Sequence, residues 1–158
     1  MNVIPEIAEK KDEIVAWRRD IHAHPELAYE EERTASFVAE RLEAWELDVH
    51  RGLATTGVVG TLSNGGGPVV GLRADMDALP IFETNTFDYK SRNDGKMHAC
   101  GHDGHTAMLL GAAQYLAANR EFSGTIHFIF QPAEEAAGGA KVMMDDGLFN
   151  FFPVQAVF

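Results

Sequence analysis

Three short clusters in the sequence carry side chains of the types that hold metal ions or transfer protons. They are Asp75-Met76-Asp77 after the apolar run PVVGLRA, Cys100-Gly101-His102 ahead of a helical stretch, and Glu134-Glu135 after the run IHFIFQPA. Thiolate, imidazole and carboxylate are the ligands that zinc and neighbouring divalent metals accept. In open α/β sheets, ligands bind beyond the carboxyl ends of strands. We therefore expect the three clusters to meet in one crevice and to form a metal-dependent active site.

Within such a site, adjacent carboxylates can take different roles. One of Glu134 and Glu135 can ligate the metal, while the other takes a proton from metal-bound water, whose pKa falls from about 15.7 to about 7 on the ion. Asp75 and Asp77 lie two residues apart on an extended strand and so point to the same side. One of this pair can therefore ligate the metal or orient a ligand while the other lies close behind it.

Two other interpretations of these residues remain open. Cys100 could act as a nucleophile with His102 or His105 as its base, but acyl transfer also needs an oxyanion site, and the sequence does not identify one. A non-enzymatic alternative is a partial metal-binding fold that binds without turnover. Activity that survives exhaustive chelation would favour the first alternative, and metal binding without hydrolysis would favour the second.

The remaining titratable residues have ordinary structural explanations. A cysteine alone is most often a small buried hydrophobe, so the metal role of Cys100 depends on its neighbours. The roles of His98 and His105 stay open, because four histidine or cysteine residues within positions 98–105 offer more ligands than one ion needs. The acids at 30–32 are expected to be a solvated helix start, where negative charge favours the positive end of the helix dipole. We assign no metal role to His22, His24, His50 or His127.

Alternating helical and strand patterns must position these clusters. Apolar spacing predicts helices over 5–22, over about 32–46, over 106–119 and over 138–146. Short β-branched runs bounded by turn residues predict strands at 47–52, 56–62, 68–72, 124–130 and 154–158, and residues 83–99 form a polar loop. The order of these elements predicts an α/β fold with a mixed, mostly parallel sheet and helices on both faces.

Composition narrows the class of protein further. The 13 Lys+Arg set against 24 Asp+Glu give a formal charge of −11, which argues against a nucleic acid or an anionic membrane surface as partner. With 46% hydrophobic residues the chain can bury a core as one domain. The single Cys100 and the polar N-terminus indicate a protein of the reducing cytoplasm, with neither secretion nor membrane insertion. The apolar ending QAVF predicts that the chain is cut inside a strand.

Four segments, taken together, resemble a known family. They are His22-Ala-His-Pro-Glu-Leu-Ala-Tyr-Glu-Glu31, Gly71-Leu-Arg-Ala-Asp-Met-Asp-Ala-Leu-Pro80, Met97-His-Ala-Cys-Gly-His-Asp-Gly-His-Thr106 and Phe130-Gln-Pro-Ala-Glu-Glu135. Their sequence and order resemble the successive motifs of the hippurate hydrolase-type metal amidohydrolases, in the aminoacylase and carboxypeptidase superfamily. Each motif is weak alone, but four in the right order cover nearly the whole chain.

The resemblance implies a zinc-aminopeptidase-like catalytic domain that hydrolyses the amide bond of N-acyl amino acids, a small-molecule substrate class. It implies a site with two divalent ions, which are zinc, manganese, cobalt or nickel. Residue by residue, Cys100, His102 and Glu135 match metal ligands, Glu134 matches the general base, and Asp77 matches the acid that orients the site. Asp75 stands where related peptidases carry a histidine ligand, so its expected place is behind the ligands.

Family members are about twice as long or more, and they carry an inserted lid and dimerisation domain and two later histidine ligands. Residues 1–158 therefore correspond to the N-terminal portion of the catalytic metal-binding domain, without the lid. We expect this chain alone to be inactive or nearly so. We also expect either a homo-oligomer or self-association through exposed sheet edges.

Overall fold

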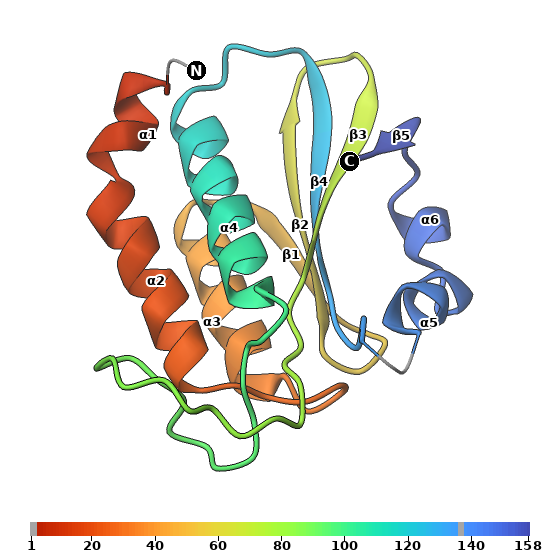
Figure 1. Ribbon diagram of the computed structural model, residues 1–158. Helices are drawn as coiled ribbons and strands as arrows, with labels where there is room; N and C mark the ends of the chain where they lie inside the picture. Colours follow the sequence, from red (N-terminus) through yellow and green to blue (C-terminus); the bar gives the residue numbers. More distant parts are fainter. Residues whose placement is uncertain (1–2, 136–137) are drawn as a thin grey trace.

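The computed structural model describes residues 3–135 and 138–158, in which a five-stranded sheet lies between helices (Figure 1). The strands are β1 (Asp48–Leu53), β2 (Gly57–Asn64), β3 (Val69–Asp75), β4 (Gly124–Gln131) and β5 (Ala156–Val157). The helices are α1 (Pro5–Glu9), α2 (Lys11–Ala23), α3 (Glu32–Ala44), α4 (His102–Ala118), α5 (Gly139–Asp145) and α6 (Leu148–Phe151). The predicted α/β class is confirmed.

The strands are ordered β1-β2-β4-β3-β5 across the sheet. β2 pairs antiparallel with both β1 and β4, whereas β3 pairs parallel with both β4 and β5. The β1–β2 connection is too short for the crossover that parallel strands need, while α4 supplies such a crossover between β3 and β4. The expected mixed sheet is confirmed, although its described pairings divide equally between the two directions instead of being mostly parallel.

Helices cover both faces of the sheet, as the sequence predicts. α2, α3 and α4 pack on one face, and neighbouring strand residues alternate between the two sides (Figure 1). Val58 and Phe128 belong to the core under the long helices, whereas Val59 and Ile129 belong to a smaller cluster with α5 and α6. The sheet is therefore covered unequally, by long helices on one face and by short elements on the other.

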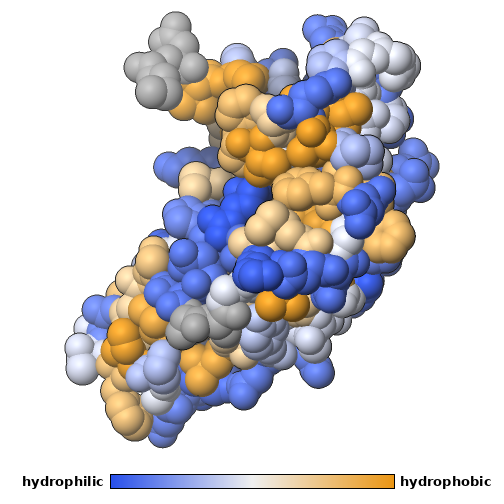
Figure 2. All heavy atoms as spheres, turned by 90° about the vertical axis from the view of Figure 1, so that its right-hand side faces the viewer, coloured by the Kyte–Doolittle hydropathy of each residue, from blue (hydrophilic) through white to orange (hydrophobic). Residues whose placement is uncertain are grey.

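The less covered side, which carries α5, α6 and β5, displays apolar side chains among polar ones (Figure 2). Its exposed large hydrophobic residues are Met144, Phe149, Phe151, Val157 and Phe158. None of the described helices is both long enough and apolar enough to span a membrane.

Several element boundaries differ from those expected. The first helix is divided at Lys10 into α1 and α2, and α6 lies in a stretch for which no helix is predicted. The important difference concerns α4, which begins at His102 instead of Thr106. Its N-cap is Gly101, whose φ of 91° lies in the left-handed region that glycine adopts without steric cost. As a result, His102 sits in the first turn of α4 instead of in the preceding loop.

Candidate metal centre

Three segment ends bring the polar clusters together. β3 ends at Asp75 and β4 ends at Gln131, and these two residues are partners in the parallel pairing. The chain after β3 carries Asp77, and the turn after β4 carries Glu134 and Glu135. The N-terminus of α4 adds His102 beside them, so the carboxyl edge of the sheet gathers all three clusters, as the sequence predicts.

His102 lies at the centre of this group. Its Nδ1 is 2.9 Å from the backbone oxygen of Asp77 and 3.2 Å from the carboxylate Oδ1 of the same residue. Both partners are acceptors, so Nδ1 carries the hydrogen and Nε2 keeps its lone pair in the neutral ring. Nε2 lies 3.6 Å from Asp75 Oδ2, 3.7 Å from Glu135 Oε1 and 3.9 Å from Glu134 Oε2. The imidazole is therefore held with its free nitrogen toward the carboxylates.

The electrostatics of the pair His102 and Asp77 follow from these contacts. Burial opposes ionisation of Asp77, but hydrogen bonds from His102 and from the backbone N–H groups of Glu135 and Glu134 hold its pKa below the ordinary value. Burial likewise opposes a charge on His102, but the hydrogen bond to Asp77 and the charges of Asp75 and Asp77 raise its pKa. The contacts therefore favour the ionised form of Asp77 beside the ring of His102.

Two groups of side chains in the described chain have the donor atoms and proximity that a metal ion needs. In the first, Cys100, His102 and Glu135 each offer one ligand atom, and these atoms lie within 4.8 Å of one another. Oε1 of Glu135 is buried and has no hydrogen-bond partner among the described residues. A buried carboxylate oxygen without a donor is costly, and a cation would satisfy it.

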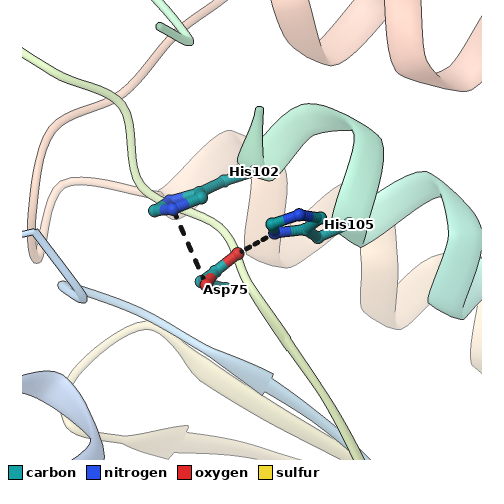
Figure 3. A group of neighbouring side chains, drawn as sticks. All are labelled: Asp75, His102 and His105. Atoms are coloured by element: carbon teal, nitrogen blue, oxygen red, sulfur yellow. Dashed lines mark hydrogen bonds and ion pairs between the residues drawn. The ribbon is translucent and has the colours of Figure 1, made fainter. Parts of the chain in front are cut away.

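The second group consists of Asp75 at the end of β3 with His102 and His105 from α4 (Figure 3). Here the carboxylate already has partners, because Oδ1 lies 2.7 Å from His105 Nδ1 and Oδ2 lies 2.9 Å from Arg73 Nη1. The guanidinium of Arg73 thus binds Oδ2, the same oxygen of Asp75 that lies nearest to His102 Nε2. Both carboxylate oxygens of Asp75 therefore have partners, whereas Oε1 of Glu135 in the first group has none among the described residues.

The other candidate residues lie around these groups. The side chain of Glu134 is 42% exposed and so reaches solvent, while that of Glu135 is half as exposed, at 21%. His98 is buried, belongs to neither group, and has a pKa lowered to about 4, mainly by burial. Its ring nitrogens have no hydrogen-bond partner among the described residues. Of the residues proposed from the sequence, Asp77, Cys100, His102, Glu134 and Glu135 all lie at this edge of the sheet.

A buried ion-pair network beside the site was missed by the sequence analysis. Asp103, next to His102, is buried and accepts hydrogen bonds from Arg18 Nε at 3.0 Å and from His22 Nδ1 at 2.8 Å. His22 Nε2 lies 3.1 Å from Glu83 Oε1. Because Arg18 and His22 belong to α2, this network fixes the first turn of α4 against α2. His22 lies at the end of α2 as expected, but it also connects this helix with Asp103 and Glu83.

The acids at 30–32 were expected to be solvated, and for the middle one this is wrong. Glu30 and Glu32 are exposed, but Glu31 is fully buried. The reason is that α3 begins here, which turns Glu31 toward the protein interior and its two neighbours toward solvent.

Cys100 should react slowly as a nucleophile in the metal-free protein. Although Cys100 is exposed, hydrogen bonding of its thiol to the Glu135 side chain, then partial loss of hydration, then the charges of Glu135, Glu134 and Asp75 raise its pKa to about 11. At pH 8 only about one thiol in a thousand is then ionised. We expect iodoacetamide to alkylate the folded chain far more slowly than the urea-unfolded chain, with a rate that rises up to about pH 11. Because this is the single cysteine, intact mass reports on it directly. Rapid alkylation at pH 7 would support the nucleophile alternative.

Comparison with known proteins adds an independent observation. A family model named peptidase family M20/M25/M40 matches residues 71–158. The chain is 49% identical to a hippurate hydrolase of Campylobacter jejuni, over 100% of this chain and 41% of that protein. It superposes with a TM-score of 0.91 on a putative aminohydrolase from methicillin-resistant Staphylococcus aureus, at 38% identity over 97% of this chain and 41% of that one.

A second solved structure is the YXEP protein of Bacillus subtilis, named as a dinuclear metal binding peptidase from the M20 family. It matches with a TM-score of 0.89 and 40% identity, over 96% of this chain and 43% of that chain. The chain thus spans about two fifths of the length of the relatives it matches. The family model covers more than half of the chain and includes the three clusters at the edge of the sheet. The resemblance inferred from the four motifs is confirmed, and the chain belongs to peptidase family M20/M25/M40.

Proposed function

We propose that the protein containing this chain hydrolyses the amide bond of N-acyl amino acids in a metal-dependent reaction. The observation that carries the proposal is Oε1 of Glu135, which is buried and has no hydrogen-bond partner among the described residues. Glu135 also offers a ligand atom that lies within 4.8 Å of the ligand atoms of Cys100 and His102. The names of the relatives support the reaction class, since they include hippurate hydrolase and N-acyl-L-amino acid amidohydrolase.

The residues present fit a divalent cation. Thiolate, imidazole nitrogen and carboxylate form a donor set that suits zinc and neighbouring metals. His102 has the arrangement usual for a metal-bound histidine, because its Nδ1 faces the carboxylate and backbone oxygen of Asp77. We therefore assign Cys100, His102 and Glu135 as ligands and Asp77 as the residue that orients His102. The name of the Bacillus relative supports two ions at such a site.

When bound, the metal supplies Lewis acidity, which polarises the amide carbonyl and acidifies water. The side chains of the protein then move the proton. Glu134 is partly exposed and lies 3.9 Å from His102 Nε2, at the open side of the group. In our proposal, its carboxylate accepts a proton from the attacking water and then donates it to the leaving amine. The products are a carboxylic acid and an amino acid.

We further propose that residues 1–158 form the N-terminal portion of a catalytic metal-binding domain and lack part of its ligand set. Two ions commonly need about five or six protein ligands. The group in this chain that supports metal binding offers three, Cys100, His102 and Glu135. The 158 residues alone are therefore expected to bind metal weakly and to have little activity.

The function is tested in the full-length protein by removing metal with a chelator, reloading zinc or manganese, and assaying hippurate and N-acetyl amino acids. We expect activity to disappear with the metal and to return with it. Activity that survives exhaustive chelation would overturn the metal mechanism in favour of a Cys100 nucleophile. Tight metal binding without hydrolysis of any acyl amino acid would overturn the proposed activity in favour of a binding fold.

A further inference from the structure

Glu31 is a buried acid for which the proposed reaction has no role. It is fully buried at the N-cap of α3, and its two carboxylate oxygens bind groups from two distant segments. Oε2 accepts a hydrogen bond from the hydroxyl of Thr56 at 2.6 Å, and Oε1 accepts one from the backbone N–H of Ala133 at 2.9 Å. Glu31 therefore connects the start of α3 with the β1–β2 turn and with the turn that follows β4.

The second of these turns carries the proposed base, and it adopts an unusual backbone conformation. Ala133 has a φ of 56°, in the left-handed region where the Cβ atom of an L-residue crowds the following carbonyl oxygen. Ala133 is fully buried, and its carbonyl oxygen accepts a hydrogen bond from Gly139 N–H at 2.9 Å. Such a conformation persists only where the surroundings hold it, and Glu31 holds the N–H of the strained residue.

The other end of the same turn is fixed from the opposite side. The backbone N–H of Glu135 donates to Asp77 Oδ2 at 3.0 Å. Glu134 lies between the two anchor points, with Ala133 held by Glu31 on one side and Glu135 held by Asp77 on the other. The backbone is thus anchored on both sides of Glu134.

We propose that Glu31 is a positioning residue for Glu134, acting through the N–H group of Ala133. This inference rests on the proposed function, since it concerns the base of that reaction. Burial raises the pKa of Glu31, against the hydrogen bonds from Thr56 and from the backbone of Glu31, Ala133 and Tyr29, which lower it. A buried acid is costly compared with an apolar side chain of similar size. What the acid provides at this position is an acceptor for the strained turn.

The test compares two substitutions in the full-length, metal-loaded protein. Glu31→Gln keeps a carbonyl oxygen for Ala133 N–H and can donate from its amide to the hydroxyl oxygen of Thr56. Glu31→Leu keeps much of the volume and removes the acceptor. Glu32→Leu is the matched control, because it is the same substitution on the exposed neighbour. The measurements are kcat, KM, metal content, and hydrogen exchange of the Ala133 amide.

We expect Glu31→Leu to lower kcat about 100-fold with KM and metal content unchanged, because misplacing a catalytic group by about 1 Å has an effect of this size. The amide of Ala133 should exchange faster in this variant. Glu31→Gln should keep kcat within about tenfold of the wild type and keep the amide protected, and Glu32→Leu should change neither measurement.

Equal kcat in Glu31→Leu and the wild type would overturn the positioning role while leaving the proposed reaction intact. A fall in metal content that accounts for the loss of activity would overturn it as well. If Glu31→Leu does not fold, the wild type still provides a test, because an unprotected Ala133 amide contradicts the proposal. If the wild type hydrolyses no acyl amino acid, the proposed reaction is wrong. Hydrogen exchange of the Ala133 amide then still tests whether Glu31 holds this N–H group.

Discussion

Replacement of Glu134 by glutamine in the full-length protein is expected to lower kcat about 10²–10⁴-fold while leaving metal content unchanged. Glutamine keeps the shape of the side chain but cannot accept the proton from the attacking water. Glu134 is the more exposed of the two adjacent glutamates, and the group Cys100, His102 and Glu135 does not include it. The loss should therefore appear in kcat and in kcat/KM together, as for an interaction made in the transition state.

The measurement is steady-state hydrolysis of hippurate beside metal analysis of the same samples. Glu40→Gln on the exposed side of α3 is the matched control, and it should have wild-type kinetics. Wild-type turnover in Glu134→Gln would exclude the residue as the base. Loss of metal in this variant would instead assign Glu134 as a ligand and leave the base unidentified.

The convergence of the site could be predicted from the sequence because it depends on a general property of the fold. Asp75 and Gln131 end neighbouring parallel strands, so the residues that follow them meet at one edge. The order of the strands could not be predicted in the same way. Local sequence shows where a strand lies but not which strand it pairs with. The antiparallel pairing of β2 with β4 joins residues that are far apart in the chain, from Asn64 with Gly124 to Val58 with Phe130.

The start of α4 and the burial of Glu31 also depend on contacts with distant parts of the chain, which the local sequence does not reveal. Gly104, inside the first turn, makes a helix start at His102 unfavourable by propensity, and the contacts of the neighbouring Asp103 with α2 hold this turn in place. A signal for Glu31 was available, since it precedes Ala35, Val38 and Leu42 at helical spacing and so shares their face. Its acidic neighbours concealed this pattern, and its partners Thr56 and Ala133 are far away in the sequence.

Replacement of His102 by alanine is expected to have the largest effect on metal binding. The substitution removes the one residue that both candidate groups share, together with the nitrogen that faces the carboxylates. Loss of a residue that only orients a ligand commonly lowers metal affinity about 10–100-fold. Loss of the ligand itself should exceed about 100-fold, and activity should fall with it. Titration of the metal-free full-length protein with zinc or manganese measures the effect.

Two further variants decide which group holds the ion. Asp77→Asn weakens the partner of His102 and should give the smaller loss of about 10–100-fold. His105→Ala changes only the second group, in which Asp75 keeps its ion pair with Arg73, and it should leave affinity close to that of the wild type. If His105→Ala reduces affinity as much as His102→Ala does, the ion is held by the second group and the assignment of Cys100 and Glu135 as ligands is wrong. If instead His102→Ala reduces affinity strongly and His105→Ala leaves it close to that of the wild type, the second group is excluded and the ion is held by the group that contains Cys100, His102 and Glu135.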